Sequence, residues 1–149
     1  MNIRIRTAKK NDIPIILGLL YELGRPKPQT DSEVEVFRNL VKKQISDSRN
    51  SILVAENDDV NVVGMLSIIF LPRLNRNDLE LYVPEIIVSE KYQKKGIGTK
   101  LMEACIDLAK ENQCHSIRLE SGTFRKEAHQ FYKNFGFESN SLSFTLNIR

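Results

Sequence analysis

Val88-Ser89-Glu90-Lys91-Tyr92-Gln93-Lys94-Lys95-Gly96-Ile97-Gly98-Thr99 is the most informative segment of this chain. A strand pattern ends here, a polar turn with two close glycines follows, and an amphipathic helix begins near Gly98. The first turn of a helix leaves backbone N–H groups unpaired and carries partial positive charge. Glycine lets an anion approach that backbone without a clash with Cβ. Lys94 and Lys95 add positive charge nearby, so the turn predicts a pyrophosphate-binding site.

Two other glycine motifs do not fit this turn. The dinucleotide fingerprint needs a third glycine, and that position is Leu101. The P-loop needs lysine and then serine or threonine directly after its last glycine, whereas Gly98 is followed by Thr99 and Lys100. From the glycines alone, a tight strand-to-helix turn without any ligand remains an equal alternative.

Outside this turn, the hydrophobic pattern predicts a mixed α/β chain. Strands are expected at 3–6, 51–56, 62–71, 79–88, 116–120 and 142–148, and helices at 13–23, 32–48, 98–112 and 125–135. Ser32 and Glu35 form a capping-box pattern at the second helix, and Gly136 is expected to end the last one. Antiparallel strands come first and β-α-β units later, which predicts one domain, residues 1–149, with a mixed sheet.

The composition is that of a globular protein. Hydrophobic residues make up 41% and charged residues 28%, values that exclude a disordered chain. No apolar run is long enough to cross a bilayer and no signal-peptide block is present, so no membrane partner and a cytoplasmic location are expected. The net charge of +3 is spread along the chain, which argues against nucleic-acid binding. Cys105 and Cys114 lack a metal-binding spacing, so no metal is expected.

Two segments carry a resemblance to a known family. Gln93–Gly98 resembles the Gln/Arg-x-x-Gly-x-Gly/Ala coenzyme A signature of the GNAT superfamily of acetyl-CoA-dependent N-acetyltransferases. Arg125–Phe137 resembles the second motif of that family, a helix with an Ala-x-x-Phe-Tyr core that ends in Gly-Phe. The order of elements from Ile3 to Ile148 also fits. The resemblance implies a single-domain α/β fold with a mixed, mostly antiparallel central sheet, a splayed strand pair and about four flanking helices.

The same resemblance implies which residues bind acetyl-CoA, the expected co-substrate. Backbone hydrogen bonds like those of an added strand would hold the pantetheine arm, at Ile86, Ile87 and Val88. The turn would cradle the pyrophosphate, through Lys94, Lys95, Gly96, Ile97, Gly98 and Thr99. Arg125 occupies a position that often faces the cofactor and is commonly asparagine in relatives.

The resemblance also implies an acid and a base. Tyr132 matches the tyrosine that the family places near the coenzyme A sulfur, and the resemblance favours this role over the alternative of a core aromatic. Relatives often carry acidic residues at the positions of Pro84 and Glu85, which makes Glu85 the first candidate base and a surface carboxylate the alternative. Glu120 is the second candidate base. The family has a bulge in this strand, and Pro84 is compatible with one.

The expected activity is direct transfer of an acetyl group to a primary amine of a small molecule. The second motif and Ser141–Leu146 look similar to those of relatives that acetylate small amines. Acetylation of protein N-termini or lysines is the alternative, and a non-catalytic acetyl-CoA-binding module is a third interpretation. A homodimer is left open.

Overall fold

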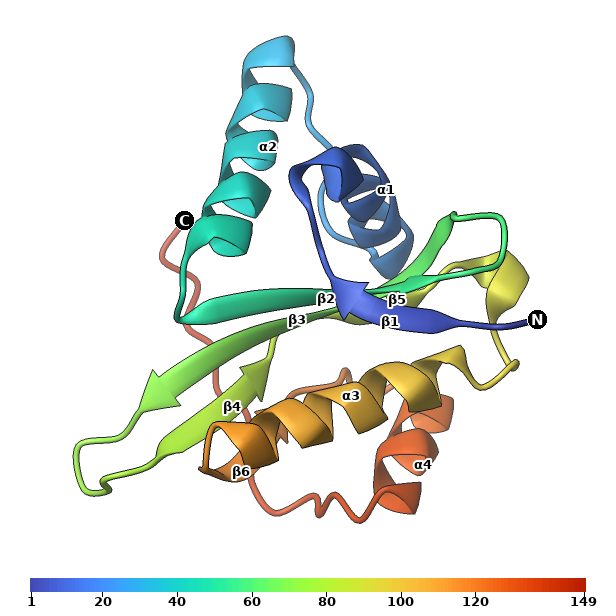
Figure 1. Cartoon of the computed structure of the whole chain (residues 1–149). Helices are drawn as coiled ribbons and strands as arrows, with labels where there is room; N and C mark the ends of the chain where they lie inside the picture. The colour runs from blue at the N-terminus through green and yellow to red at the C-terminus, as the bar shows by residue number, and fades with distance from the viewer. The chain divides into compact units, whose positions relative to one another are not determined.

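The computed structural model describes all residues from Met1 to Arg149, and the chain divides into two compact units, Met1–Arg118 and Leu119–Arg149. Figure 1 traces the elements in order from β1 to α4. None of the helices is long and apolar enough to cross a membrane. Each unit has its own internal packing, and the expected site residues are distributed over both.

The first unit is built on a sheet of six strands in the order β1-β2-β3-β4-β6, with β5 paired to β3. The strands are β1 (Arg4–Thr7), β2 (Asn50–Glu56), β3 (Val62–Pro72), β4 (Leu79–Val83), β5 (Ile86–Val88) and β6 (Cys114–Leu119). The pairs β1–β2, β2–β3, β3–β4 and β3–β5 are all antiparallel. The predicted α/β class with a mostly antiparallel sheet is therefore confirmed.

Three helices cover this sheet, α1 (Ile13–Leu23) and α2 (Asp31–Ser46) on one face and α3 (Ile97–Glu111) on the other (Figure 1). Because both faces are covered, β2 and β3 are buried almost continuously rather than at alternate positions. Apolar side chains of α1, α2, β2 and β3 form one core cluster, which includes Ile16, Val41, Ile52, Val54 and Met65. This core includes β3, the strand that pairs with β5.

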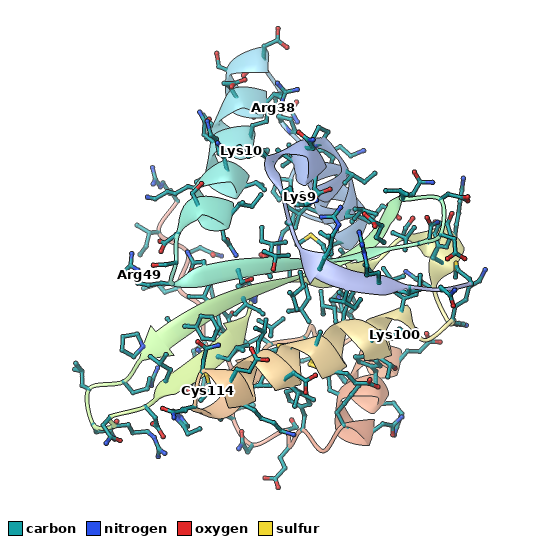
Figure 2. The ribbon with its side chains drawn as sticks, viewed as in Figure 1. Lys9, Lys10, Arg38, Arg49, Lys100 and Cys114 are labelled. Carbon is teal, nitrogen blue, oxygen red and sulfur yellow. The ribbon has the colours of Figure 1, made fainter.

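Positive charge in this unit is distributed over separate elements. Among the basic residues that Figure 2 labels, Lys9 and Lys10 lie at the turn before α1, Arg38 on α2, Arg49 before β2 and Lys100 on α3. These basic residues, which are separated along the sequence, are thus also separated in the structure.

The start of α2 differs from the prediction. The N-cap is Thr30, whose Oγ1 accepts a hydrogen bond from Glu33 N at 3.1 Å. The Glu33 carboxylate accepts one from Gln29 N at 2.8 Å. Thr30–Glu33 and Ser32–Glu35 both fit the pattern of a capping box, and the earlier pair caps the helix. On this helix Leu40 is 60% exposed, whereas the neighbouring Val41 is buried in the core.

The predicted strand 79–88 is interrupted by a bulge at Pro84 and Glu85. Ile69 pairs with Tyr82 and Leu66 pairs with Ile86, so that residues 83–85 lie opposite residues 67–68. One residue more on one strand than on its partner is the definition of a β-bulge. The expected bulge is confirmed, and it separates β4 from β5.

The second unit contains α4 (Lys126–Asn134), which ends as predicted at Gly136. Gly136 has φ +98°, its N–H donates to Lys133 O at 2.9 Å, and Phe137 N donates to Tyr132 O at 3.2 Å. These two bonds define a Schellman motif. The rings of Tyr132 and Phe137 pack edge to face across it, with centroids 5.8 Å apart.

The strand predicted at 142–148 is wrong, because no regular structure follows α4. The alternating side chains are 81–88% exposed, at Leu142, Phe144, Leu146 and Ile148. Alternation determines only which way side chains would point in a strand, and a strand forms only where a neighbouring backbone supplies hydrogen bonds. Phe124, which precedes α4, is also 77% exposed.

Candidate functional site

The turn between β5 and α3 leaves a run of backbone donors unused. Lys94 and Gly96 adopt left-handed conformations, with φ +62° and +83°. The first bond of α3 runs from Lys100 N to Gly96 O at 3.2 Å, and the N–H groups of residues 94–99 donate no hydrogen bond within the chain. Successive N–H groups in such a turn, next to a helix N-terminus, form a concavity that attracts anions.

Contacts on both sides hold this turn in place. Gln93, the first residue of the glycine motif, donates through Nε2 to Val88 O at 3.0 Å. Glu90 N donates to the Glu22 carboxylate of α1 at 3.1 Å. Nothing in the sequence around Glu22 distinguishes it from other exposed carboxylates of a helix, so this contact could not be predicted. Both contacts fix the turn without using any donor of residues 94–99.

One edge of β5 carries backbone groups that no strand uses. Ser67 N donates to Glu85 O at 2.9 Å and Ser89 N donates to Val63 O at 2.8 Å, so these residues direct their backbone toward β3. By the alternation of an antiparallel ladder, Ile86 and Val88 direct theirs away from β3. No strand pairs with β5 on that side. An extended ligand could add there as a further strand.

Gly64 brings β3 close to β5 and α3. A Cβ at this position would lie 3.1 Å from Ile87 O and 3.3 Å from Leu101 Cδ1. Both distances are tighter than ordinary van der Waals contacts, so a larger residue would push β5 or α3 outward. The glycine therefore sets the spacing of the strand edge and the helix that carries the turn.

The bulge holds Glu85 by several hydrogen bonds to Ser67. Glu85 N donates to Ser67 Oγ at 3.0 Å, and Ser67 Oγ donates to Glu85 Oε1 at 2.5 Å. Ser67 is 1% exposed, whereas Oε2 of Glu85 accepts from Arg25 Nη2 at 3.2 Å at the edge of the bulge. Glu85 is therefore not a freely solvated carboxylate. A serine inside the apolar run of β3 was the one sequence signal for this contact.

In the second unit, Tyr132 lies among aromatic rings. Its ring centroid is 5.4 Å from that of Phe131, in an edge-to-face arrangement. Burial raises the pKa of Tyr132 above its ordinary value, and the positive charge of Arg125 opposes that rise only in part. The phenol is thus protonated at neutral pH and can donate a hydrogen bond.

The other expected residues of this unit have contacts of their own. Arg125 caps the start of α4 and places its guanidinium 5.5 Å from the Phe124 ring centroid. Glu120 accepts a hydrogen bond from Ser143 Oγ at 2.7 Å. His129 is half-buried, and its Nε2 lies 2.8 Å from Gly122 O, a contact that closes the loop before α4. The structure thus groups Glu85 with the polar turn in one unit and Tyr132 with Arg125 in the other.

These features identify a family. Residues 17–137 match the model of the acetyltransferase (GNAT) family. The chain belongs to this family. The match includes the bulge, the polar turn and α4.

Two curated relatives are named acetyltransferases, and a solved structure shares the fold. N-alpha-acetyltransferase 30 of Xenopus laevis is 38% identical over 56 residues, which are 38% of this chain and 20% of that protein. Streptothricin acetyltransferase A of Bacillus subtilis (strain 168) is 35% identical over 77 residues, or 52% of this chain and 42% of that protein. A transcriptional regulator from Bacillus halodurans C-125 has a TM-score of 0.89 and 26% identity, over 99% of this chain and 100% of that one.

The curated relatives are longer than the matched region. The chain spans 20%, 46% and 48% of the first three of them. Family membership therefore describes the matched region, residues 17–137.

Proposed function

We propose that this member of the GNAT family transfers an acetyl group from acetyl-CoA directly to the primary amine of a small molecule in the cytoplasm. The observation that carries the proposal is the run of unused N–H donors at residues 94–99 beside the unpaired edge of β5. We also propose that both compact units form one N-acetyltransferase domain, since the family match at 17–137 crosses the boundary between Arg118 and Leu119.

The residues present fit acetyl-CoA as co-substrate. The N–H groups of Lys94–Thr99 would bind the pyrophosphate, and the Lys94 and Lys95 ammonium groups would add positive charge. The outward backbone groups of Ile86 and Val88 would bind the pantetheine arm on either side of Ile87, and Arg125 is a further proposed cofactor-binding residue. When bound, acetyl-CoA supplies an activated thioester.

Glu85 is the proposed base. A primary alkylamine has a pKa near ~10.4, so it must lose a proton before it can attack. The Glu85 carboxylate would take that proton, directly or through a water molecule. Glu120 is the alternative base in the second unit, where its carboxylate already accepts from Ser143.

Tyr132 is the proposed donor to the departing sulfur. Reference pKa values of ~10 for tyrosine and ~8.5 for a thiol already make complete proton transfer uphill by about 2 kcal/mol. The raised pKa of Tyr132 increases that cost. Tyr132 would therefore act mainly by hydrogen bonding to the negative charge that develops on sulfur.

The cysteines support direct transfer. Cys105 is fully buried, and burial raises its pKa to about 12. Burial also raises the pKa of Cys114. Because the thiolate is the nucleophilic form, neither side chain is suited to carry an acyl group.

The proposed substrate class depends on a comparison of two relatives. The match to streptothricin acetyltransferase A covers 52% of this chain and the match to N-alpha-acetyltransferase 30 covers 38%. The longer match favours a small amine. Acetylation of protein N-termini or lysines is the alternative, since the second relative is named an N-alpha-acetyltransferase, and a non-catalytic acetyl-CoA-binding module is the third.

A thiol-release assay separates these alternatives. The protein would be mixed with acetyl-CoA and panels of small amines, peptides with free N-termini and lysine peptides, and free coenzyme A would be measured. We expect turnover with members of the small-amine panel. Turnover only with peptides would support the alternative, and acetyl-CoA binding without turnover on any panel would support the binding module.

A further inference from the structure

Arg25 makes the remaining contact at the bulge, and the catalytic scheme above does not use it. Its Nη2 donates to Pro84 O and to Glu85 Oε2, both at 3.2 Å. We infer that Arg25 Nη2 occupies the binding position of the acceptor ammonium, so that Arg25 and the acceptor compete for Glu85. This inference rests on the proposed function, in which Glu85 is the base.

The two acceptors around Nη2 form a site for a protonated amine. One is a carboxylate oxygen, and the other is a carbonyl oxygen of Pro84, which lies in the bulge between β4 and β5. An alkylammonium has three N–H donors and can bind the same carboxylate and carbonyl oxygens. An ammonium bound there would donate a hydrogen bond to the same carboxylate oxygen that later takes its proton.

Only one oxygen of Glu85 is available for this exchange. Oε1 is bonded to Ser67, which is 1% exposed, and breaking that bond would leave a buried hydroxyl without its acceptor. Oε2 is bonded only to the guanidinium of Arg25. An acceptor amine that binds Oε2 of Glu85 must therefore replace the guanidinium of Arg25.

The backbone of Arg25 is held by hydrogen bonds, whereas its side chain can leave Glu85. Gly24 with φ +102° ends α1, and Arg25 N donates to Leu20 O at 3.0 Å in a Schellman motif. The Arg25 side chain is 50% exposed. Exposed ion pairs contribute little stability, so an incoming cation can replace this guanidinium.

The test compares Arg25→Met with the parent and with Lys27→Met, which removes a cation from the same exposed loop. We expect Arg25→Met to lower the amine KM by about two- to fivefold, the range of one weak ion pair. The kcat, the KM for acetyl-CoA and the melting temperature should be nearly unchanged. Lys27→Met should behave like the parent.

A second measurement probes the vacated position directly. Guanidinium chloride at low millimolar concentration should inhibit Arg25→Met competitively against the amine, and more strongly than it inhibits the parent. Arg25→Gln provides a second variant if Arg25→Met melts early. An amine KM that is unchanged or raised in a folded variant, or no competitive inhibition, would overturn the inference while the proposed function stands. No thiol release by the parent would overturn both.

Discussion

The two residues proposed as base and as hydrogen-bond donor lie in opposite environments. Glu85 is ionically paired and hydrogen-bonded at the edge of the bulge, whereas Tyr132 lies among aromatic rings that raise its pKa. A carboxylate that accepts a proton and a phenol that keeps its own are the two roles needed for aminolysis of a thioester. The assignment predicts that the Tyr132 hydroxyl matters to turnover more than to stability.

Tyr132→Phe tests this prediction. The change removes one oxygen and keeps the edge-to-face packing with Phe131 and Phe137. If the hydroxyl stabilises charge on sulfur, the loss falls on kcat, in the range of about 10²–10⁴-fold for acid–base contributions. Steady-state kinetics with a substrate from the panel would measure it.

Tyr82→Phe is the matched control, because it also removes one phenol oxygen and keeps the ring 4.6 Å from the Arg118 guanidinium. It should leave kcat near the parent value. A kcat for Tyr132→Phe within about twofold of the parent, less than any general-acid effect, would leave protonation of the sulfur to water.

The sequence predicted roles for Glu85 and Tyr132 but gave no prediction for their neighbours. Ser67 and Arg25 lie 18 and 60 residues from Glu85 along the chain, and each bonds to a different oxygen of the carboxylate. Such pairings depend on how β3 and the end of α1 meet the bulge. No local sequence pattern determines how these distant elements pack, so contacts of this kind could not be predicted from residue spacing.

Among the elements, the β5–α3 turn is the one that the sequence described best. Its glycines, lysines and helix start all act locally, and the structure adds the left-handed φ at Lys94 and Gly96 that aligns the donors. A local motif of this kind needs no distant partner to form. One substitution in the first turn of α3 therefore tests whether this turn binds acetyl-CoA.

Gly98→Asp should weaken acetyl-CoA binding about tenfold or more, a free-energy change of about 1.4 kcal/mol. The substitution places a carboxylate where a pyrophosphate should lie, while the first turn of a helix tolerates Asp well. The variant should therefore stay folded. Isothermal titration with acetyl-CoA would measure the change.

Asn75→Asp adds the same charge on the exposed β3–β4 loop and serves as the control. It should bind acetyl-CoA like the parent. Equal affinity in a folded Gly98→Asp variant would mean that the turn has only a structural role.

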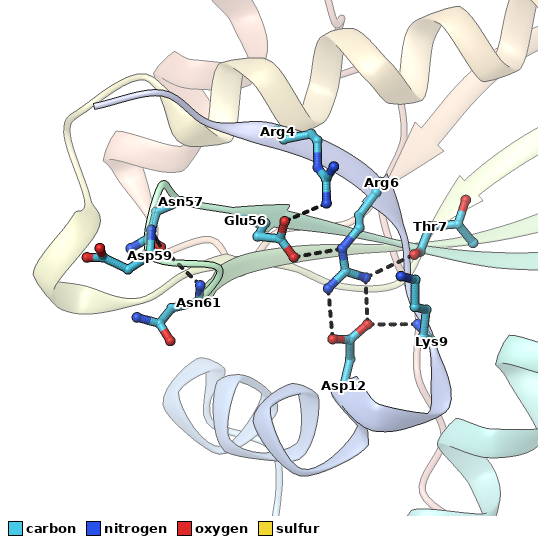
Figure 3. Close-up of polar contacts among 9 residues, drawn as sticks. All are labelled: Arg4, Arg6, Thr7, Lys9, Asp12, Glu56, Asn57, Asp59 and Asn61. Carbon is cyan, nitrogen blue, oxygen red and sulfur yellow. Dashed lines mark hydrogen bonds and ion pairs between the residues drawn. The ribbon is translucent and has the colours of Figure 1, made fainter.

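A second element-level contact fastens β1 to α1 and β2. Figure 3 shows Arg6 between two carboxylates, with bonds of 2.8 and 3.0 Å to Asp12 and 2.9 Å to Glu56. Hydrogen bonding to Arg6 is the main reason why the pKa values of Asp12 and Glu56 lie below their ordinary range. A depressed carboxylate pKa adds stability above the unfolded-state pKa, and that stability is lost as pH falls.

The free energy of unfolding should therefore decrease as the pH falls below about 5, where the unfolded chain begins to bind protons that the native carboxylates do not. Asp12→Asn should reduce stability at pH 7 and flatten this acid dependence. Asp107→Asn, at an exposed position on α3, should leave both unchanged. Urea unfolding at pH 7, 5 and 4 would measure the effect, and a parallel fall in parent and Asp12→Asn would contradict it.

Elements at the end of the chain were predicted least well. The apolar alternation at 142–148 was as regular as that of a strand, but those residues have no ladder partner in this structure. The helices predicted at 13–23 and 98–112, by contrast, form and bury apolar side chains at Ile16, Leu17, Leu101 and Cys105. Helices satisfy their own backbone hydrogen bonds and strands do not, so a periodic pattern is stronger evidence for a helix.

At the scale of the whole molecule, binding and folding are coupled. A ligand that binds only the native state adds stability that grows with its concentration, about 2.7 kcal/mol at 100 times its dissociation constant. For a chain of about 150 residues, each kcal/mol raises the melting temperature by roughly 2–4 °C. Acetyl-CoA alone, without any amine, should therefore raise the melting temperature by about 5–10 °C at that saturation.

A comparison of acetyl-CoA with adenosine and with coenzyme A would show which part of acetyl-CoA causes the rise in melting temperature. Adenosine lacks both the pyrophosphate and the pantetheine arm, so it should produce little shift. Coenzyme A should produce most of the shift, because the turn at 94–99 and the edge of β5 would bind groups that it shares with acetyl-CoA. Differential scanning fluorimetry over a concentration series would follow the rise. No shift with millimolar acetyl-CoA would mean that the unused donors of this turn do not bind the cofactor, and the proposed activity would fail with them.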